Sequence, residues 1–257
     1  MKNLFFLMSF LIISSSQAQV TQMSFFKMED GDIWGEKFIN TQTNYFKKFV
    51  QEAKDKNKVL SWNVWRLIGP SYSDHNFAVS TSFETIQKST ANWDLDMKDV
   101  LGIEGQYLWD DDWKWIENQL FRVQSSVAGD AKFVVIIYIN DKVWERSNNQ
   151  ADYWEPVMQK MISNGDLGVK SYSSQSLIYP TKTKDDMKMF ISVGFENRSD
   201  ALSFVDMGYI KEDQKNWDII QAAVKKIHGD EKPEYDTGWG FGEDSYMLIY
   251  EKITGIN

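Results

Sequence analysis

The chain has 257 residues, a formal net charge of −9, 42% hydrophobic and 15% aromatic residues, and no cysteine. The absence of cysteine excludes disulfides, thiol nucleophiles and cysteine-ligated zinc or iron–sulfur sites. Because no basic block offsets the acidic excess, nucleic acid and anionic membrane surfaces are poor partners. The length suffices for one large domain or two small ones, stabilised by packing alone.

A secretion signal is predicted at the N-terminus. Lys2 precedes a short apolar run at residues 4–13, and Ser16 and Ala18 are the small residues of a cleavage site. The run is too short to cross a bilayer comfortably, although a retained anchor is the alternative. A lipoprotein would need a cysteine at the cleavage point. We therefore expect removal of residues 1–18 and a periplasmic or extracellular mature chain, neither a lipoprotein nor inserted in the membrane.

Two segments of the chain carry the same succession of patterns. The first has a strand-like stretch at 24–28, apolar residues at helical spacing over 46–53, SWNVWRLIGP at 61–70 and FAVSTSFE at 77–84. The second has corresponding patterns at 133–139, 154–161, 171–180 (SYSSQSLIYP) and 189–196 (MFISVGFE). Each segment is typical of a strand, a helix and two further strands, which indicates an internal repeat.

The last elements of the two segments are less alike. Trp113, Ile116, Leu120 and Val123 have the same helical spacing as the apolar residues at 217–227, so a second helix is predicted in both segments. Only the second segment has an evident final strand, SYMLIYEK at 245–252, and whether the first has its own stays open. A long insertion at 89–112 and the stretch TGWGFGED at 237–244 are the irregular segments, where binding sites often lie.

The order β-α-β-β-α-β is that of a ferredoxin-like layer, in which helices cover one face of an antiparallel sheet. We therefore predict an α+β fold of two tandem ferredoxin-like repeats, at residues 19–130 and 131–257. The paired runs at 23–84 and 132–196 resemble the dimeric α+β barrel superfamily, which includes antibiotic-biosynthesis-monooxygenase-like and NIPSNAP-like domains.

This resemblance implies a pseudo-dimeric α+β barrel. The superfamily includes cofactor-free oxygenases, haem-dependent enzymes and proteins with no known activity, so the resemblance does not select a function. Two separate α+β domains without a joint barrel are the alternative fold.

Histidine occurs only at positions 75 and 228, which argues against a histidine-rich metal or haem site. His228 follows two lysines and precedes Gly229, a pattern typical of a helix C-terminus. His75 lies in the predicted turn SYSDHN, where a solvated hairpin residue is the simplest interpretation. An acid–base role with Tyr72 and Asp74 is the alternative.

The acidic clusters have structural interpretations. Residues 110–112 are three aspartates before the predicted helix at Trp113, where they would stabilise a helix N-terminus. Asp94, Asp96 and Asp99 resemble the start of a calcium loop but lack its glycine and terminal glutamate. The G-W-G-F-G run at 238–242 precedes a strand instead of opening a helix, and no nucleophile-elbow or P-loop motif occurs. We expect no metal and no cofactor.

Candidate ligand contacts lie mainly on the strand at 61–68. Strand alternation puts Trp62 and Arg66 on one face and Trp65 on the other, and one of these faces must pack against helices. Arg66 has no counterpart in the second segment, which fits either a ligand contact or an internal salt bridge. The six candidate ligand-binding residues are Trp62, Trp65, Arg66, Tyr72, His75 and Tyr172.

Three functions fit these observations. A binding protein that holds a small apolar or aromatic ligand between its two repeats is favoured, because the scaffold is aromatic-rich and its loops diverge. The alternatives are a cell-envelope interaction protein without catalysis and a cofactor-independent oxygenase-like or isomerase-like enzyme that uses His75, Tyr72, Asp74 and Arg66. The catalytic residues and the oligomeric state are left open.

Overall fold

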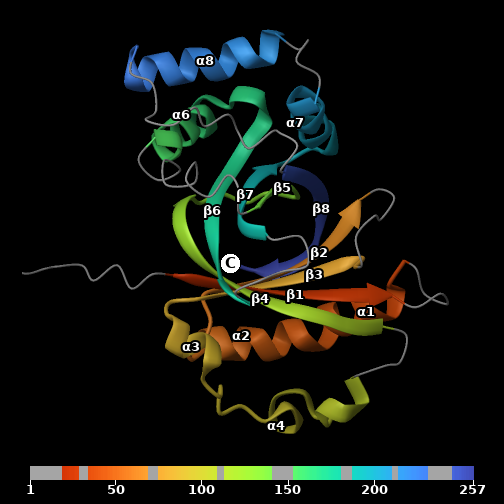
Figure 1. The fold of residues 1–257 in the computed structure, drawn as a ribbon. Helices are drawn as coiled ribbons and strands as arrows, with labels where there is room; N and C mark the ends of the chain where they lie inside the picture. Colours follow the sequence, from red (N-terminus) through yellow and green to blue (C-terminus); the bar gives the residue numbers. More distant parts are fainter. Residues whose placement is uncertain are drawn as a thin grey trace, which may run out of the picture.

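The computed structural model describes residues 19–28, 34–68, 75–108, 113–140, 153–180, 187–209, 214–230 and 245–257. In this part of the chain, eight antiparallel strands close into one barrel in the order β1-β3-β2-β8-β5-β7-β6-β4 (Figure 1). The strands are β1 (Val20–Met28), β2 (Ser61–Ile68), β3 (Phe77–Phe83), β4 (Trp113–Val127), β5 (Phe133–Asn140), β6 (Val169–Tyr179), β7 (Met187–Phe195) and β8 (Ser245–Ile256). The predicted α+β class is confirmed, and a joint barrel replaces the alternative of two separate domains.

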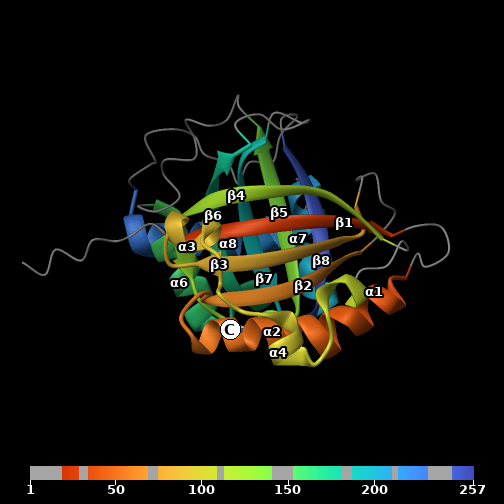
Figure 2. The same cartoon turned by 90° about the horizontal axis from the view of Figure 1, so that it is seen from below.

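The two halves of the barrel have the same strand order. β4-β1-β3-β2 forms the first half and β8-β5-β7-β6 the second, and the halves join where β2 pairs with β8 and β4 pairs with β6. Figure 2 shows the strands of the first half crossing those of the second. Because all neighbouring strands are antiparallel, β1, β2, β5 and β6 run in one direction and the other four strands in the opposite direction. We call the end of the barrel at which β1, β2, β5 and β6 finish the site end.

The helices cover the outside of the barrel, those of the first half on one side and those of the second half on the opposite side (Figure 1). The first half has α1 (Glu36–Thr41), the π-helical turn η1 (Gln42–Phe46), α2 (Lys47–Asp55), α3 (Ile86–Thr90), α4 (Met97–Leu101) and the short η2 (Gly105–Leu108). The second has α6 (Glu155–Asn164), η5 (Asp166–Gly168), α7 (Arg198–Tyr209) and α8 (Gln214–His228). None of the described helices is both long and apolar enough to span a bilayer.

The helical stripes on α2 and α6 form as the sequence pattern predicts. Phe49, Val50 and Ala53 are buried on α2, and Val157, Met158 and Met161 are buried on α6. Phe49 stacks on Trp93 at a centroid distance of 5.9 Å, and the other five residues belong to two apolar cores between helices and strands, one in each half of the molecule. Proline in the first turn of α6 and an αL glycine after its last residue fix the bounds of that helix.

A third apolar core fills part of the barrel interior and includes residues of both halves. It contains Met23, Phe25, Ala78, Phe121, Val134, Ile136, Tyr138, Met187, Phe190 and Tyr250. Along β5, Val134, Ile136 and Tyr138 point into the barrel, whereas the intervening residues pack against the helices. The near-continuous apolar sequence of β5 therefore reflects a strand that is buried on both faces.

The predicted helix at residues 113–123 is wrong, because this segment is the long strand β4. Its apolar residues mimic helical spacing, but a register shift at Phe25/Phe26 of β1 makes Ile116 an extra residue in β4 and changes the alternation. Phe121 is consequently the fully buried residue of this segment, while Ile116 is exposed. The first half thus has its own last strand, and the aspartates at 110–112, which lie outside the described residues, do not precede a helix.

The insertion at 89–112 contains the end of α3, α4 and η2. Asp96 caps α4 by accepting hydrogen bonds from the backbone N–H groups of Lys98 and Asp99, and Asp94 forms an ion pair with Lys58. These contacts account for the acidic cluster that resembles a calcium loop. The glycine-rich stretch at 237–244 lies outside the described residues.

Candidate functional site

A chain of three polar side chains crosses the barrel interior at the site end. Nε2 of His75 lies 2.8 Å from the hydroxyl of Tyr250, and that hydroxyl lies 3.2 Å from the hydroxyl of Tyr138. Tyr138 can donate to Tyr250, and the Tyr250 hydroxyl then donates to Nε2 of His75 or accepts from it, according to the tautomer of the imidazole. We call these residues the tyrosine–histidine chain.

Three separate elements bring this chain together. His75 precedes β3, Tyr138 lies near the end of β5, and Tyr250 is in the middle of β8. The imidazole ring contacts Phe25 at a centroid distance of 4.6 Å and lies nearly parallel to the Tyr250 ring at 6.1 Å. His75 therefore joins the aromatic lining of the interior and is not the solvated hairpin residue that the sequence suggests.

Burial keeps both phenols of the chain in their neutral form. Desolvation raises the pKa of Tyr138 well above its usual value of 10.0, and the neighbouring Tyr250 and Glu117 raise it further. Desolvation also raises the pKa of Tyr250, against a smaller opposing effect of the hydrogen bond with Tyr138. At neutral pH the two phenols are therefore protonated and can each donate a hydrogen bond.

The wall of the barrel formed by β4 carries acceptor groups. Glu117 lies opposite Phe25 in the β1–β4 pairing, and Gln119 lies opposite Met23, so both share the face of these interior residues. Nε2 of Gln119 donates to Oε1 of Glu117 at 2.6 Å. Oε1 of Gln119 is buried and has no hydrogen-bond partner in the described part of the chain.

Two of the six predicted ligand-binding residues face the barrel interior. These are His75 and Trp65, whose indole N–H donates to the hydroxyl of Ser80 at 2.9 Å. Trp62 packs in the core beneath the helices of the first half, and Tyr172 packs in the core of the second. Arg66 forms an ion pair with Glu251 at 2.6 Å across the β2–β8 junction. Of the two interpretations of Arg66, the structure thus shows the internal salt bridge.

Tyr72 lies outside the described residues, as does Asp74. The contribution of Trp62, Arg66, Tyr72 and Tyr172 to ligand binding stays a prediction, whereas Trp65 and His75 lie at the barrel interior. The sequence reasoning missed Tyr138, Tyr250 and Glu117. A tyrosine within the apolar run FVVIIYIN was the one local signal that could have indicated Tyr138.

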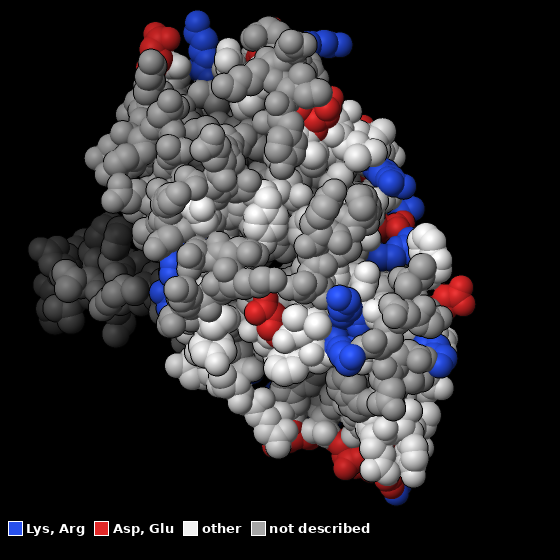
Figure 3. All heavy atoms as spheres, turned by 45° about the vertical axis from the view of Figure 1, so that its right-hand side comes forward, with Lys and Arg blue, Asp and Glu red and all other residues white. Residues whose placement is uncertain are grey.

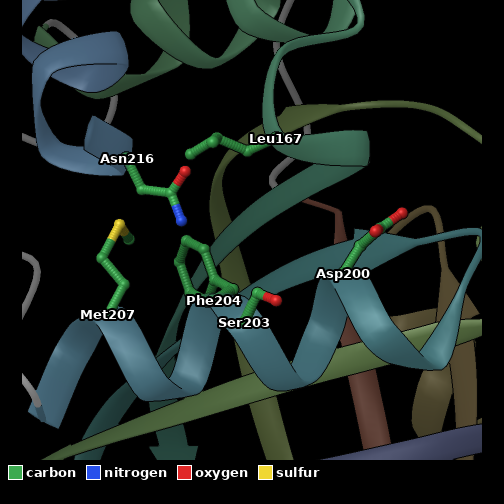
Figure 4. Close-up of a pocket in the computed structure, with 6 residues that line it drawn as sticks. All are labelled: Leu167, Asp200, Ser203, Phe204, Met207 and Asn216. Atoms are coloured by element: carbon green, nitrogen blue, oxygen red, sulfur yellow. The ribbon is translucent and has the colours of Figure 1, made fainter. Parts of the chain in front are cut away.

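A surface pocket of about 190 Å³ lies outside the barrel, against α7 (Figure 4). Phe204 and Met207 form its apolar side, and Asp200, Ser203 and Asn216 supply polar groups. Leu167 of η5 closes the remaining side. The pocket shares no residue with the tyrosine–histidine chain.

The second histidine has a structural contact. His228 is the last residue of α8, as its sequence context predicts, and Gly229 follows in the αL region. Its ring stacks on Tyr153 at a centroid distance of 4.1 Å, and its Nε2 lies 2.9 Å from the backbone carbonyl oxygen of Tyr153. His228 thus holds the end of α8 against the start of α6.

Within the described ranges, the acidic and histidine side chains form no group of three or more that could hold a metal ion. On the face seen in Figure 3, the described lysine and arginine side chains lie among aspartate and glutamate.

No protein-family model matches the sequence, and no curated protein matches it. Solved structures match its fold. A candidate monooxygenase from Lactobacillus acidophilus NCFM has a TM-score of 0.50 and 9% identity, over 93% of this chain and 95% of that chain. A candidate monooxygenase from Fusobacterium nucleatum subsp. nucleatum has a TM-score of 0.50 and 9% identity, over 93% and 94%. At these identities the likeness shows the fold alone, and it supports the expected resemblance to dimeric α+β barrels.

Proposed function

We propose that the protein binds a small, partly apolar ligand inside the barrel, in contact with Trp65 and the tyrosine–histidine chain. The observation that carries this proposal is the chain itself, a line of hydrogen-bonded polar groups within an otherwise aromatic and aliphatic interior. Binding sites for small molecules are typically apolar cavities with a few convergent polar groups. The combination at the site end has this composition.

The accessibility of inward-facing side chains also supports the proposal. Trp65, Leu67, Leu177 and Leu248 pack against the interior core and are only partly buried. Close packing leaves side chains in the middle of a filled core without accessible surface. Their residual exposure is what an incompletely filled barrel interior would produce.

An interior-filling variant tests this proposal. Ser192 lies opposite Ile136, whose side chain is in the interior core, so Ser192→Phe would add volume to the interior. We expect native mass spectrometry of the wild-type protein, purified without denaturation, to detect a bound small molecule that Ser192→Phe loses. Ser192→Ala, which adds no volume, should retain the molecule. Equal occupancy in the wild-type protein and Ser192→Phe would contradict binding in the interior.

A second candidate function, cofactor-independent oxygenase-like or isomerase-like catalysis, is favoured by the same chain. A neutral imidazole hydrogen-bonded to a buried phenol can act as a general base for a ligand beside it. Oxygen uptake with hydroquinone as the probe, compared between the wild-type protein and His75→Gln, tests this function. Uptake that is equal in both proteins would contradict a catalytic role of His75.

We also propose that the two halves are tandem ferredoxin-like repeats, 19–130 and 131–257, and that the chain is exported after removal of residues 1–18. The shared strand order of the halves supports the first proposal, and the N-terminal pattern supports the second. N-terminal sequencing of protein from a periplasmic fraction should give Gln19 as the first residue. An uncleaved Met1 in that fraction would contradict cleavage.

A further inference from the structure

One carboxylate of the barrel interior, that of Glu117, has no cationic partner among the described residues. Glu117 is partly buried and faces the same way as Phe25. The hydrogen bond from Gln119 is the only one that the carboxylate accepts in the part of the chain that the structure describes, and no described Lys, Arg or His is ion-paired with it. A carboxylate withdrawn from water is normally stabilised by a counter-charge or by several donors. The carboxylate of Glu117 therefore offers acceptor oxygens that no described cationic side chain occupies.

A second acceptor beside Glu117 is unmatched as well. Gln119 is 4% exposed, and its Oε1 accepts no hydrogen bond from any described residue. The orientation of this amide is determined, because the carboxylate of Glu117 can only accept and must face the Nε2 group. An unpaired buried carbonyl oxygen costs roughly 1–3 kcal/mol. A donor in the interior would relieve this cost.

The surfaces around these acceptors are aromatic. Phe25 lies opposite Glu117 on β1, and the phenol of Tyr138 is near enough for the carboxylate to raise its pKa. Tyr250 and the ring of His75 complete this side of the interior. Ring faces attract cations, and ammonium groups are often bound by several rings together with a carboxylate.

We propose that the ligand of the barrel interior is an organic amine, whose ammonium group is held by Glu117 and Oε1 of Gln119 while its aromatic or apolar body packs among the rings of Phe25, Tyr138 and Tyr250. An ammonium group has donors for both acceptors and no acceptor of its own. An anionic ligand would be repelled by Glu117, and a neutral one would leave its charge uncompensated. This inference rests on the proposed binding function and adds the chemical class of the ligand.

Three probes that share a phenylethyl group and differ in charge test the inference. Phenethylamine is cationic at neutral pH, 2-phenylethanol is neutral, and 3-phenylpropionate is anionic. Binding to the full chain is measured by saturation-transfer NMR and by calorimetry. We expect phenethylamine to bind at least tenfold more tightly than 2-phenylethanol, and 3-phenylpropionate to bind most weakly.

Two variants assign the preference to the acceptors. Glu117→Gln should lower the affinity for phenethylamine at least fivefold and leave that for 2-phenylethanol within a factor of two, whereas Glu52→Gln, an exposed control on α2, should change neither. Gln119→Met removes the second acceptor and should weaken the amine alone.

Each outcome has a distinct meaning. Equal affinities for amine and alcohol, or an amine affinity that survives Glu117→Gln, would overturn the amine inference and leave the binding function in place. If none of the three probes binds the wild-type protein, the binding function fails together with the inference. The melting temperature of each variant, measured by circular dichroism, shows whether it is folded.

Discussion

Tyr250 connects the tyrosine–histidine chain, because its hydroxyl contacts both His75 and Tyr138. Tyr250→Phe removes this hydroxyl and leaves the Tyr138 hydroxyl buried without its partner. We expect a loss of about 1–3 kcal/mol in the free energy of unfolding, measured by urea titration. Tyr179→Phe, at a tyrosine that is 64% exposed, is the matched control and should change the stability by less than about 0.5 kcal/mol. Equal effects of the two variants would contradict the hydrogen-bonded chain.

Buried tyrosines also predict how stability depends on alkaline pH. Burial raises the pKa values of Tyr138, Tyr172 and Tyr250 above the usual 10.0. The unfolded chain can ionise these phenols above pH 10 while the folded chain keeps them neutral, so their contribution is fully present below pH 10 and is lost as the pH rises further.

The expected decrease is at most about 1.4 kcal/mol per pH unit for each buried tyrosine. It can be measured by urea titration between pH 9 and pH 11.5, with tyrosinate absorbance followed in parallel. Replacing Tyr172 by Phe should reduce the slope. A stability that is flat above pH 10 would contradict the raised pKa values.

At the scale of elements, β4 is the segment in which strand pairing overrides the helical spacing of the apolar residues. In a helix with its apolar face at residues 113–123, Ile116 would be buried, whereas in the strand Phe121 is fully buried and Ile116 is 38% exposed. Phe121→Ala should therefore cost about 3–5 kcal/mol of unfolding free energy, and Ile116→Ala less than about 1 kcal/mol. Urea titrations of the two variants measure this difference, and the reverse order would favour the helix.

The sequence allowed prediction of the elements whose periodicity is set by one buried face. The stripes of α2, α6 and α8 belong to this group, and β5 was predictable because burial on both faces makes its sequence a near-continuous apolar run. β4 could not be predicted, because its register shift at Phe25/Phe26 is produced by pairing with β1 and leaves no local signal. The helices α4 and η2 within the insertion at 89–112 were not predicted either, since each is only four or five residues long and leaves no periodic pattern.

The candidate site was predictable only in part. Strand alternation separated Trp65 from Trp62 and Arg66, and the scarcity of histidine drew attention to His75. Tyr138 and Tyr250 come together through the pairing of β5 with β8, and His75 reaches them only because β8 also pairs with β2. Such contacts across the junction of two halves depend on barrel closure, which no local pattern specifies.

At the scale of the whole molecule, the two halves share the core of the barrel interior and both junctions between strands. Phe121 of the first half and Phe190 of the second meet edge to face, with a centroid distance of 4.6 Å. The free energy of each half therefore depends on the other, and the molecule should unfold in one transition.

A double-mutant cycle on this ring pair tests the dependence. We expect Phe121→Ala and Phe190→Ala to be non-additive, with a coupling energy of about 0.5–1.5 kcal/mol, because each substitution alone removes the same edge-to-face contact. Unfolding is followed by far-ultraviolet circular dichroism and by tryptophan fluorescence, whose transitions should coincide in the wild-type protein and in each variant. Additive effects together with two separate transitions would indicate that the halves fold independently, although they form one closed sheet.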